Sequence, residues 1–260
     1  MQKYVRLEKA VGETPLSALE AYRTEHPELL NVPLTYAGRL DPMASGTLLI
    51  LCGDECKVRD IYNALDKEYE FEVLFGYSTD TGDTLGMPKR AAKTERYSLN
   101  KLSQIAAKLR GVHTVPYPAF SSKTVAGKPL FEYALSNKLH TIAIPTVEMR
   151  IYKLRCESVR TITGSTLLER ILSKIVLLKS NDFRAEAIGL AWSDLLKNDN
   201  TQYAIAKFRA VVGSGSYIRT LAPMIAKLAG TDGIAYSIHR RAIGRYMPIV
   251  GRFGWWRKRY

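Results

Sequence analysis

The chain has 260 residues, of which 46% are hydrophobic, and its formal net charge at pH 7 is +13. This length can bury a core without staples, and the three cysteines form neither an even disulfide framework nor a paired zinc pattern. There is no apolar N-terminal segment and no window near the roughly 18 apolar residues of a membrane span, so we expect a cytoplasmic protein. The positive charge favours a polyanionic partner.

The N-terminal third contains one helix pattern and one strand pattern. Thr14 and Pro15 are typical of an N-cap and of the first helical position, and an apolar face follows them. Between Tyr69 and Tyr77, apolar and aromatic residues alternate with glutamates, as in a half-buried strand. The sequence therefore predicts a helix from residue 15 and a strand over 69–77 whose polar face carries the glutamates.

A second helix pattern precedes a proline-rich segment. Ser98 is placed as the N-cap of an apolar pattern over 99–109, and Gly111 stands where a left-handed C-terminal cap belongs. Residues 115–129 are rich in proline and follow this helix. We expect them to form a loop or a small insertion on the main sheet.

A strand, a turn and a helix are predicted in the last third. Residues 203–212 are rich in strand formers, and a Gly-Ser-Gly-Ser turn follows them. Residues 219–229 have a helical pattern whose Pro223 must lie in the first turn. This order places residues 217–219 near the start of a helix.

The most informative stretch runs from residue 36 to 48 and holds an aspartate between a leucine and a proline. Pro42 keeps Asp41 away from helical dihedrals, and Gly38 and Gly46 allow close turns or a close approach to a ligand. The stretch therefore presents one carboxylate on a constrained loop. Asp-Pro turns are common, so spacing alone does not make Asp41 catalytic.

Residues 38–46, Gly-Arg-Leu-Asp-Pro-Met-Ala-Ser-Gly, resemble the catalytic loop of TruB-type pseudouridine synthases of the tRNA pseudouridine-55 type. Four further segments resemble motifs of that family in the same order. They are residues 9–15, 67–69 with 76–86, 118–128 and 215–221. Ala10 and Pro15 depart from the family pattern. The resemblance extends from about residue 9 to 245 and covers nearly the whole chain.

The resemblance implies an α+β pseudouridine synthase fold, in which helices flank a mixed, mostly antiparallel sheet. We expect a catalytic domain over residues 1–245, with a small insertion at about 87–140, and a basic aromatic tail over 246–260. Most bacterial members continue into an RNA-binding PUA domain, which we expect this chain to lack.

The resemblance also implies roles for individual residues. Asp41 would be the nucleophile, Tyr69 the ring that stacks on the target base, and Arg219 the cation that pairs with Asp41. Each role is chemically reasonable, because a carboxylate can attack a flipped uridine, an arginine fork keeps it ionised, and a ring supports a base. Without the resemblance, Tyr69 at the start of a strand would be interpreted as a core residue. Further substrate-binding candidates are Tyr36, Lys9 and Tyr217.

Basic and aromatic residues alternate near the end of the chain, a pattern that suits single-stranded RNA. Candidate RNA-binding residues are Arg240, Arg241, Arg252 and Lys258. The composition fits equally a solubilising terminus whose aromatic residues pack on the body.

The activity implied by the resemblance is the isomerisation of uridine to pseudouridine in tRNA, at position 55 of the T-loop, with the base flipped out. We expect no metal and no organic cofactor, the tRNA T-arm as the partner, no obligate protein partner, and a monomer.

Three alternatives are open. Tyr36 stands where the family usually has a histidine, which raises the possibility of a catalytically weak tRNA-binding or tRNA-folding module on the same scaffold. A pseudouridine synthase with another RNA target is the second alternative. The third, a glycosidase, needs a paired acid, and no second carboxylate stands out beside Asp41.

Overall fold

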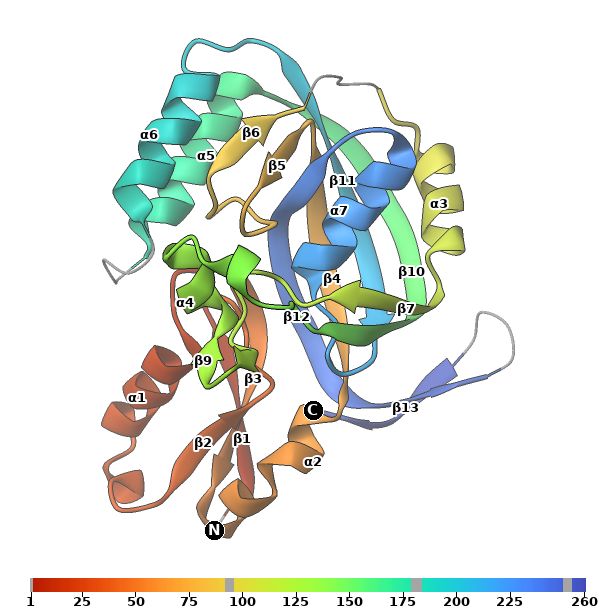
Figure 1. Ribbon diagram of the computed structural model, residues 1–260. Coiled ribbons are helices and arrows are strands. Elements are labelled where there is room, and N and C mark those ends of the chain that lie inside the picture. The colour runs from red at the N-terminus through yellow and green to blue at the C-terminus, as the bar shows by residue number, and fades with distance from the viewer. Residues whose placement is uncertain (1, 92–95, 179–183, 250–253) are drawn as a thin grey trace.

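A twisted sheet forms the centre of the protein in a computed structural model that describes residues 2–91, 96–178, 184–249 and 254–260 (Figure 1). Its strands are β1 (Tyr4–Lys9), β2 (Leu34–Ala37), β3 (Ala44–Cys52), β4 (Asp66–Phe75), β7 (Gly111–Pro116), β10 (Thr146–Thr163), β11 (Gln202–Val212), β12 (Gly233–Pro248) and β13 (Gly254–Arg259). They follow the order β1-β3-β12-β4-β11-β10-β7, with β2 added to β3 and β13 to β12. β3 and β12 are parallel, and the other pairs are antiparallel.

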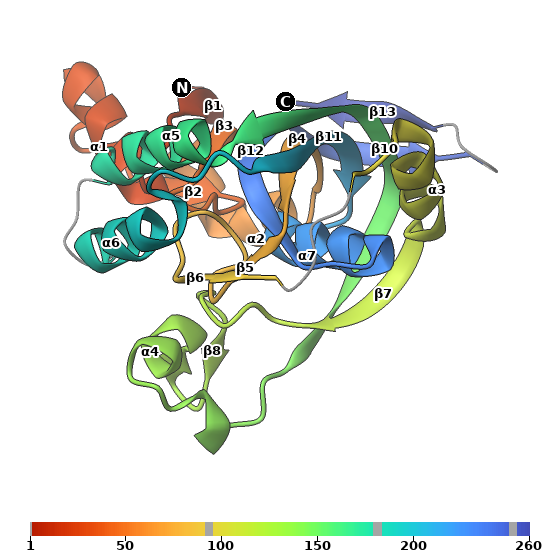
Figure 2. The ribbon, with the colours of Figure 1, turned by 90° about the horizontal axis from the view of Figure 1, so that it is seen from above.

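Helices flank this sheet, so the predicted α+β class with a mixed, mostly antiparallel sheet is confirmed (Figures 1 and 2). They are α1 (Pro15–Glu25), α2 (Arg59–Asn63), α3 (Leu99–Lys108), α4 (Leu130–Leu135), α5 (Gly164–Val176), α6 (Ala185–Leu196) and α7 (Ile218–Ala229), with 3-10 turns at Pro27–Leu29, Gly53–Val58 and Leu139–Thr141. Within the described ranges, none of these helices has both the length and the apolar character needed to cross a bilayer.

Alternating side chains on the central strands build a core on each face of the sheet. Phe71 of β4 and Phe208 of β11 stack at 5.6 Å in the core covered by α3 and α7. Leu74 and Ile205, on the same two strands, point to the opposite core, where Trp192 of α6 is fully buried beside α5. Side chains therefore alternate between the two faces of the sheet along each strand, and this alternation decides which helices each side chain contacts.

The predicted early helix is confirmed, because α1 starts at Pro15 and Thr14 caps it by accepting a 3.0 Å hydrogen bond from the Ser17 amide. The strand predicted over 69–77 instead covers Asp66–Phe75. Gly76 ends it with φ of +93°, and Tyr77 begins the short strand β5 (Tyr77–Thr79), which pairs with β6 (Pro88–Arg90).

Two details of the predicted helices are wrong. Ser98 caps α3 as expected, but the helix ends at Lys108 with a right-handed C-cap at Leu109, and Gly111, with φ of +118°, begins β7. Pro223 lies in the second turn of α7, because that helix already begins at Ile218. Its missing N–H leaves the carbonyl of Arg219 without the usual bond along the helix.

The predicted insertion and tail occupy distinct places. Figure 2 shows α4 and the hairpin of β8 (Thr124–Val125) and β9 (Lys128–Pro129) standing off the main sheet. Of the predicted tail, in contrast, residues 246–248 end β12 and residues 254–259 form β13 beside it. The Tyr260 amide donates to the carbonyl of Ile243 at 2.8 Å. Residues 250–253 lie outside the described residues.

The parallel junction of β3 with β12 requires a glycine. Gly46 lies opposite Arg240 with φ of +108°, and a Cβ there would come within 2.2 Å of the Arg240 carbonyl oxygen. That neighbour is backbone and cannot rotate away. The junction follows directly on the loop that carries Asp41, so it holds the end of that loop at β3.

We expect Gly46→Ala to destabilise the protein by at least about 2 kcal/mol more than Gly111→Ala. Gly111 is a matched control, because its φ is similar at +118° but nothing lies within 4 Å of an added Cβ. In both variants an alanine at positive φ lowers the free energy of unfolding by about 1–3 kcal/mol, and only Gly46→Ala adds a clash with backbone atoms. Urea unfolding measures the difference, and equal losses of stability in the two variants would contradict the close packing at this junction.

Candidate active site

A cleft of about 830 Å³ opens beside the turn between β2 and β3. Its walls come from that turn, the start of β4, the segment before α7 and the insertion. The lining residues include Tyr36, Asp41, Tyr69, Phe120, Ser121, Ser216, Tyr217 and Arg219. The cleft therefore gathers segments that are far apart in the sequence.

Asp41 and Arg219 meet in this cleft as a bidentate ion pair. The Arg219 Nε donates to one carboxylate oxygen at 2.7 Å, and Nη2 donates to the other at 3.1 Å. The Arg219 side chain is only 3% exposed, whereas that of Asp41 is 32% exposed. The carboxylate is therefore held from behind and open to the cleft in front.

Arg219 is itself fixed by three other groups. Its Nη1 donates to the Thr81 carbonyl at 2.8 Å, its Nη2 to the Phe120 carbonyl at 3.0 Å, and Asp83 lies 3.6 Å from Nε. Burial disfavours the charge, but Asp41 and Asp83 outweigh it and hold the pKa of Arg219 above its usual value. The guanidinium therefore stays charged and has little freedom to turn.

Asp83 is the acidic residue of the site that the sequence analysis missed. Burial raises the pKa of its carboxyl to about 6, although Arg219 and a 2.8 Å hydrogen bond from the Thr81 hydroxyl act in the opposite direction. Residues 79–83 lie in the segment 76–86, which resembles a family motif, but that resemblance gave Asp83 no role. Nothing in their spacing indicated contact with a helix that begins more than a hundred residues later.

Arg240 lies under the loop that carries Asp41, and its predicted role in RNA binding is wrong. Its side chain is fully buried, and Nε, Nη1 and Nη2 donate to the carbonyls of Thr47, Arg39 and Gly38 at 2.8, 3.3 and 2.7 Å. Burial lowers the pKa of this guanidinium, and Tyr69 beside it opposes the shift. Arg240 therefore holds the loop from inside and has no free face for RNA.

Lys9 supports the same loop from another side, so its expected contact with substrate is also corrected. The side chain is fully buried and donates to the carbonyls of Ala10 and Glu13, both at 2.8 Å. The next turn touches the loop, because the Gly12 amide donates to the Pro42 carbonyl at 2.8 Å. Burial lowers the pKa of Lys9 to about 8, against the effect of Glu13 and Asp41.

The three predicted tyrosines all line the cleft. Tyr69 is 7% exposed and belongs to the core beneath the cleft. Tyr217 precedes α7 as its N-cap, and burial, with the charge of Asp41, raises its pKa. Tyr36, on β2, packs partly against the core under α1. Three aromatic side chains thus line the same cleft as Asp41.

The corner between α2 and β4 contributes two residues that were not predicted. The side-chain oxygen of Asn63 accepts from the Gly38 amide at 2.9 Å, and the Lys67 ammonium donates to the carbonyls of Asn63 and Leu65. Burial, together with the charge of Arg240, lowers the pKa of Lys67 to about 7. Lys67 belongs to a segment that the sequence had singled out, but its side-chain partners depend on tertiary contacts.

Two other predicted RNA-binding residues, Arg241 and Lys258, do not line the cleft. Arg241 is 43% exposed and lies 3.6 Å from Glu70, and Lys258 is exposed on β13. Arg252 lies outside the described residues. Among the described residues, no group of three or more His, Cys, Asp or Glu side chains is placed to hold a metal.

The sequence matches a family model over residues 32–170, described as "TruB family pseudouridylate synthase (N terminal domain)". The tRNA pseudouridine synthase B of Caldanaerobacter subterraneus subsp. tengcongensis is 35% identical over 120 residues, or 46% of this chain and 41% of that protein. Proteins of the same name from Aquifex aeolicus and Bacillus cereus are 27% and 28% identical, over 80% and 82% of this chain and 58% and 57% of theirs. The chain therefore spans about half the length of these curated relatives.

Solved structures share the fold at low sequence identity. A chain of the Cbf5-Nop10-Gar1 complex matches with a TM-score of 0.55 and 14% identity, over 93% of this chain and 48% of that chain. A chain of an H/ACA RNP bound to a substrate RNA containing 2'-deoxyuridine matches with a TM-score of 0.51 and 13% identity, over 91% and 46%. These matches confirm the fold that the sequence resemblance implied.

Replacing Arg240 should destabilise the loop that carries Asp41. We expect Arg240→Lys to lower the free energy of unfolding by at least about 2 kcal/mol, because one ammonium group cannot reach three separate carbonyls. The neighbouring Arg241→Lys is the control, and its effect should stay within about 0.5 kcal/mol. Chemical denaturation of both variants provides the measurement, and a mild Arg240→Lys would show that the loop does not depend on this guanidinium.

Lys67 should make stability depend on pH. The unfolded chain keeps a proton on Lys67 up to its ordinary pKa of 10.5, whereas the folded protein releases it near pH 7. The contribution of Lys67 to folding therefore becomes more favourable as the pH rises from 7 towards 10, by up to about 1.4 kcal/mol per unit.

The measurement is the free energy of unfolding of wild type minus that of Lys67→Met, taken at several pH values from 7 to 9. We expect this difference to rise with pH. Lys108→Met, at an exposed position on α3, is the control for loss of an ammonium group. A flat difference for Lys67→Met would mean that the buried side chain keeps its proton throughout this range.

Proposed function

The chain belongs to the TruB family of pseudouridylate synthases, and on this premise we propose that it isomerises uridine to pseudouridine in tRNA, at position 55 of the T-loop. The observation that carries the proposal is the bidentate pair between Asp41 and Arg219 at the wall of the cleft. In this proposal the catalytic domain covers residues 1–245, and the insertion at about 87–140 closes one side of the cleft.

Asp41 acts as the nucleophile in this proposal. The bidentate fork fixes the orientation of the carboxylate, which supports attack on a base or sugar carbon of the flipped nucleotide. The bond between N1 of the base and C1′ of the ribose then breaks, the base turns, C5 bonds to C1′, and the bond to Asp41 breaks, which restores the free carboxylate. The proton on C5 is lost and N1 gains one, so the reaction is an isomerisation that needs no oxidant, reductant or cofactor.

Tyr69, Tyr36 and Tyr217 bind the flipped nucleotide in this proposal. Aromatic rings in the cleft give a base a surface for stacking, worth about 1–3 kcal/mol per base. Polar recognition is available too, because the buried hydroxyls of Ser121 and Ser216 line the cleft and have no hydrogen-bond partner among the described residues. A uracil ring offers both a face to stack and edges to hydrogen-bond.

We assign the T-arm of tRNA as the RNA that delivers this uridine. The curated relatives are named tRNA pseudouridine synthase B, and the net charge of +13 favours a polyanion. A folded arm can be recognised by its shape, while the target base is read after it leaves the stack. A monomer that works in the cytoplasm without an obligate protein partner completes the proposal.

Replacing Asp41 tests the proposal directly. Asp41→Asn should lower pseudouridine formation at least about 1,000-fold, because the amide has nearly the same shape but cannot act as the nucleophile. Folding and tRNA binding should be close to wild type. The control is Asp194→Asn, at an exposed position on α6, which should leave activity unchanged.

Pseudouridine is mapped in a tRNA transcript after incubation with each purified protein. Pseudouridine at position 55 with wild type and its loss with Asp41→Asn would support both the target and the nucleophile. Substantial turnover by pure Asp41→Asn would exclude Asp41 as the nucleophile. Wild-type activity at a different uridine would leave the chemistry in place and overturn the assignment of the T-loop.

A further inference from the structure

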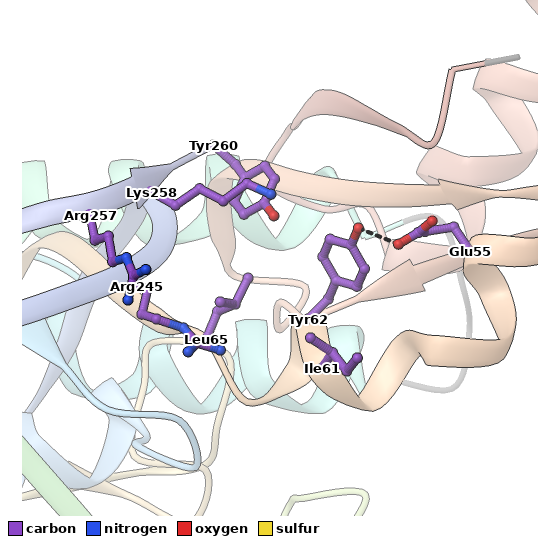
Figure 3. Close-up of a pocket in the computed structure, with 8 residues that line it drawn as sticks. All are labelled: Glu55, Ile61, Tyr62, Leu65, Arg245, Arg257, Lys258 and Tyr260. Carbon is purple, nitrogen blue, oxygen red and sulfur yellow. Dashed lines mark hydrogen bonds between the residues drawn. The ribbon is translucent and has the colours of Figure 1, made fainter.

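A second pocket, separate from the Asp41 cleft, lies between α2 and β13 and measures about 380 Å³ (Figure 3). This volume falls in the range of about 300–1,000 Å³ that is usual for pockets that hold small ligands. It is lined by Glu55, Ile61, Tyr62, Leu65, Arg245, Arg257, Lys258 and Tyr260. The proposed chemistry at Asp41 uses none of these residues.

One end of the pocket carries two arginines. Arg245 and Arg257 are exposed, and no ion pair among the described residues includes either of them. Lys258 differs, because its ammonium lies 4.8 Å from the centre of the Tyr260 ring and Glu55 acts on its charge. The adjacent Arg259 binds Glu68 at 3.0 Å. Two arginines that share a pocket without a counter-ion form a site for an anion such as a phosphate.

The floor of the pocket is aromatic and apolar. The rings of Tyr62 and Tyr260 lie 6.0 Å apart, and Ile61 and Leu65 complete the surface. The acid of the pocket, Glu55, lies at the end away from the two arginines in Figure 3 and accepts a 2.7 Å hydrogen bond from the Tyr62 hydroxyl. A flat ring attached to a phosphate matches this combination of surfaces.

The pocket and the Asp41 cleft share one short piece of chain. Ile61, Tyr62 and Leu65 face the second pocket, whereas Asn63 and Lys67 line the cleft. The Asn63 side chain also accepts from the Gly38 amide of the Asp41 loop at 2.9 Å. A polyanion that occupies the cleft therefore passes close to the second pocket, which favours a further part of the same RNA as its occupant.

We propose that this pocket binds one nucleotide of the RNA substrate, other than the uridine at Asp41, with its base against Tyr62 and Tyr260 and its phosphate on Arg245 and Arg257. The proposal rests on the proposed RNA substrate and goes beyond it by adding a second contact site. This site increases affinity for RNA and leaves the chemistry at Asp41 unchanged.

Binding of a tRNA transcript by the full chain tests the site, measured by fluorescence anisotropy over a series of salt concentrations. The double variant Arg245→Gln/Arg257→Gln should flatten the slope of log affinity against log salt by about 0.7–0.9 for each phosphate that the protein no longer neutralises. The control double variant, Arg6→Gln/Arg96→Gln, removes two exposed arginines that line neither pocket. It should change the slope much less, and an equal change in both would overturn the proposal.

The variant Tyr260→Leu tests whether the Tyr260 ring stacks on a base. Loss of one stacked base should weaken RNA binding at least about five-fold. Tyr260 also contacts Tyr4 at 4.8 Å, so a thermal melt must show that the variant is folded. Unchanged affinity in a folded Tyr260→Leu protein would exclude the stacked base.

A direct probe needs no variant and applies even if a substitution unfolds the protein. Methyl NMR of the wild-type chain, titrated with AMP, ribose 5-phosphate and adenosine, separates the two sites, because Ile61 lines the second pocket and Ile238 lines the cleft. AMP should shift the Ile61 methyl signal more than ribose 5-phosphate or adenosine does. No shift at Ile61, or an equal shift with ribose 5-phosphate, would overturn the nucleotide site.

Failure of the second pocket can be distinguished from failure of the proposed activity. Pseudouridine formation at saturating tRNA should remain near wild type in Arg245→Gln/Arg257→Gln, while the concentration of tRNA needed for half the maximal rate should rise. If wild type makes no pseudouridine but Ile61 still responds to AMP, the activity fails and the pocket stands. If wild type is active but the double variant binds tRNA like wild type, the pocket fails and the activity stands.

Discussion

The architecture of the cleft depends on one buried guanidinium, that of Arg219. It binds both oxygens of Asp41 and the carbonyls of Thr81 and Phe120, and Asp83 lies 3.6 Å away. These partners belong to the turn between β2 and β3, the turn after β5 and the insertion, while Arg219 itself lies at the start of α7. Hydrogen bonds to a charged group are strong where water is excluded, so this side chain fixes three loops relative to one helix.

Around this pair, the protein buries further cations against backbone carbonyls. Arg240 and Lys67 lie side by side next to Gly38, where they hold the Asp41 loop and the end of α2, and Lys9 holds the turn that contacts Pro42. Burial of such groups is costly, as the lowered pKa values of Lys67 and Lys9 show. The hydrogen bonds of these side chains hold the loop that carries Asp41 from below. They also place positive charge near a carboxylate that faces the cleft.

Local patterns predicted the regular elements well where local physics decides them. Thr14 with Pro15 fixed the start of α1, and the alternation around Phe71 identified β4 as a half-buried strand. Two details at the ends of helices were wrong. Gly111 joined β7 instead of capping α3, because pairing with a distant strand competes with local preference. Pro223 lies in the second turn of α7, because that helix begins at Ile218. The ordered motifs, which are not local patterns, indicated the family and the pairing of Arg219 with Asp41.

The sequence by itself determined several regular elements, because caps and alternation are written in short segments. Its five ordered motifs resembled those of one family, and that resemblance implied the class of fold and the roles around Asp41. Only the tertiary structure decided which polar residues are free to bind a ligand. Arg240 and Arg241 are neighbours in the sequence, yet one is fully buried against carbonyls and the other is 43% exposed, since adjacent residues on a strand point to opposite faces. Asp83, Asn63 and the pocket beside Tyr260 arise likewise from contacts between segments far apart in the chain, which no local pattern encodes.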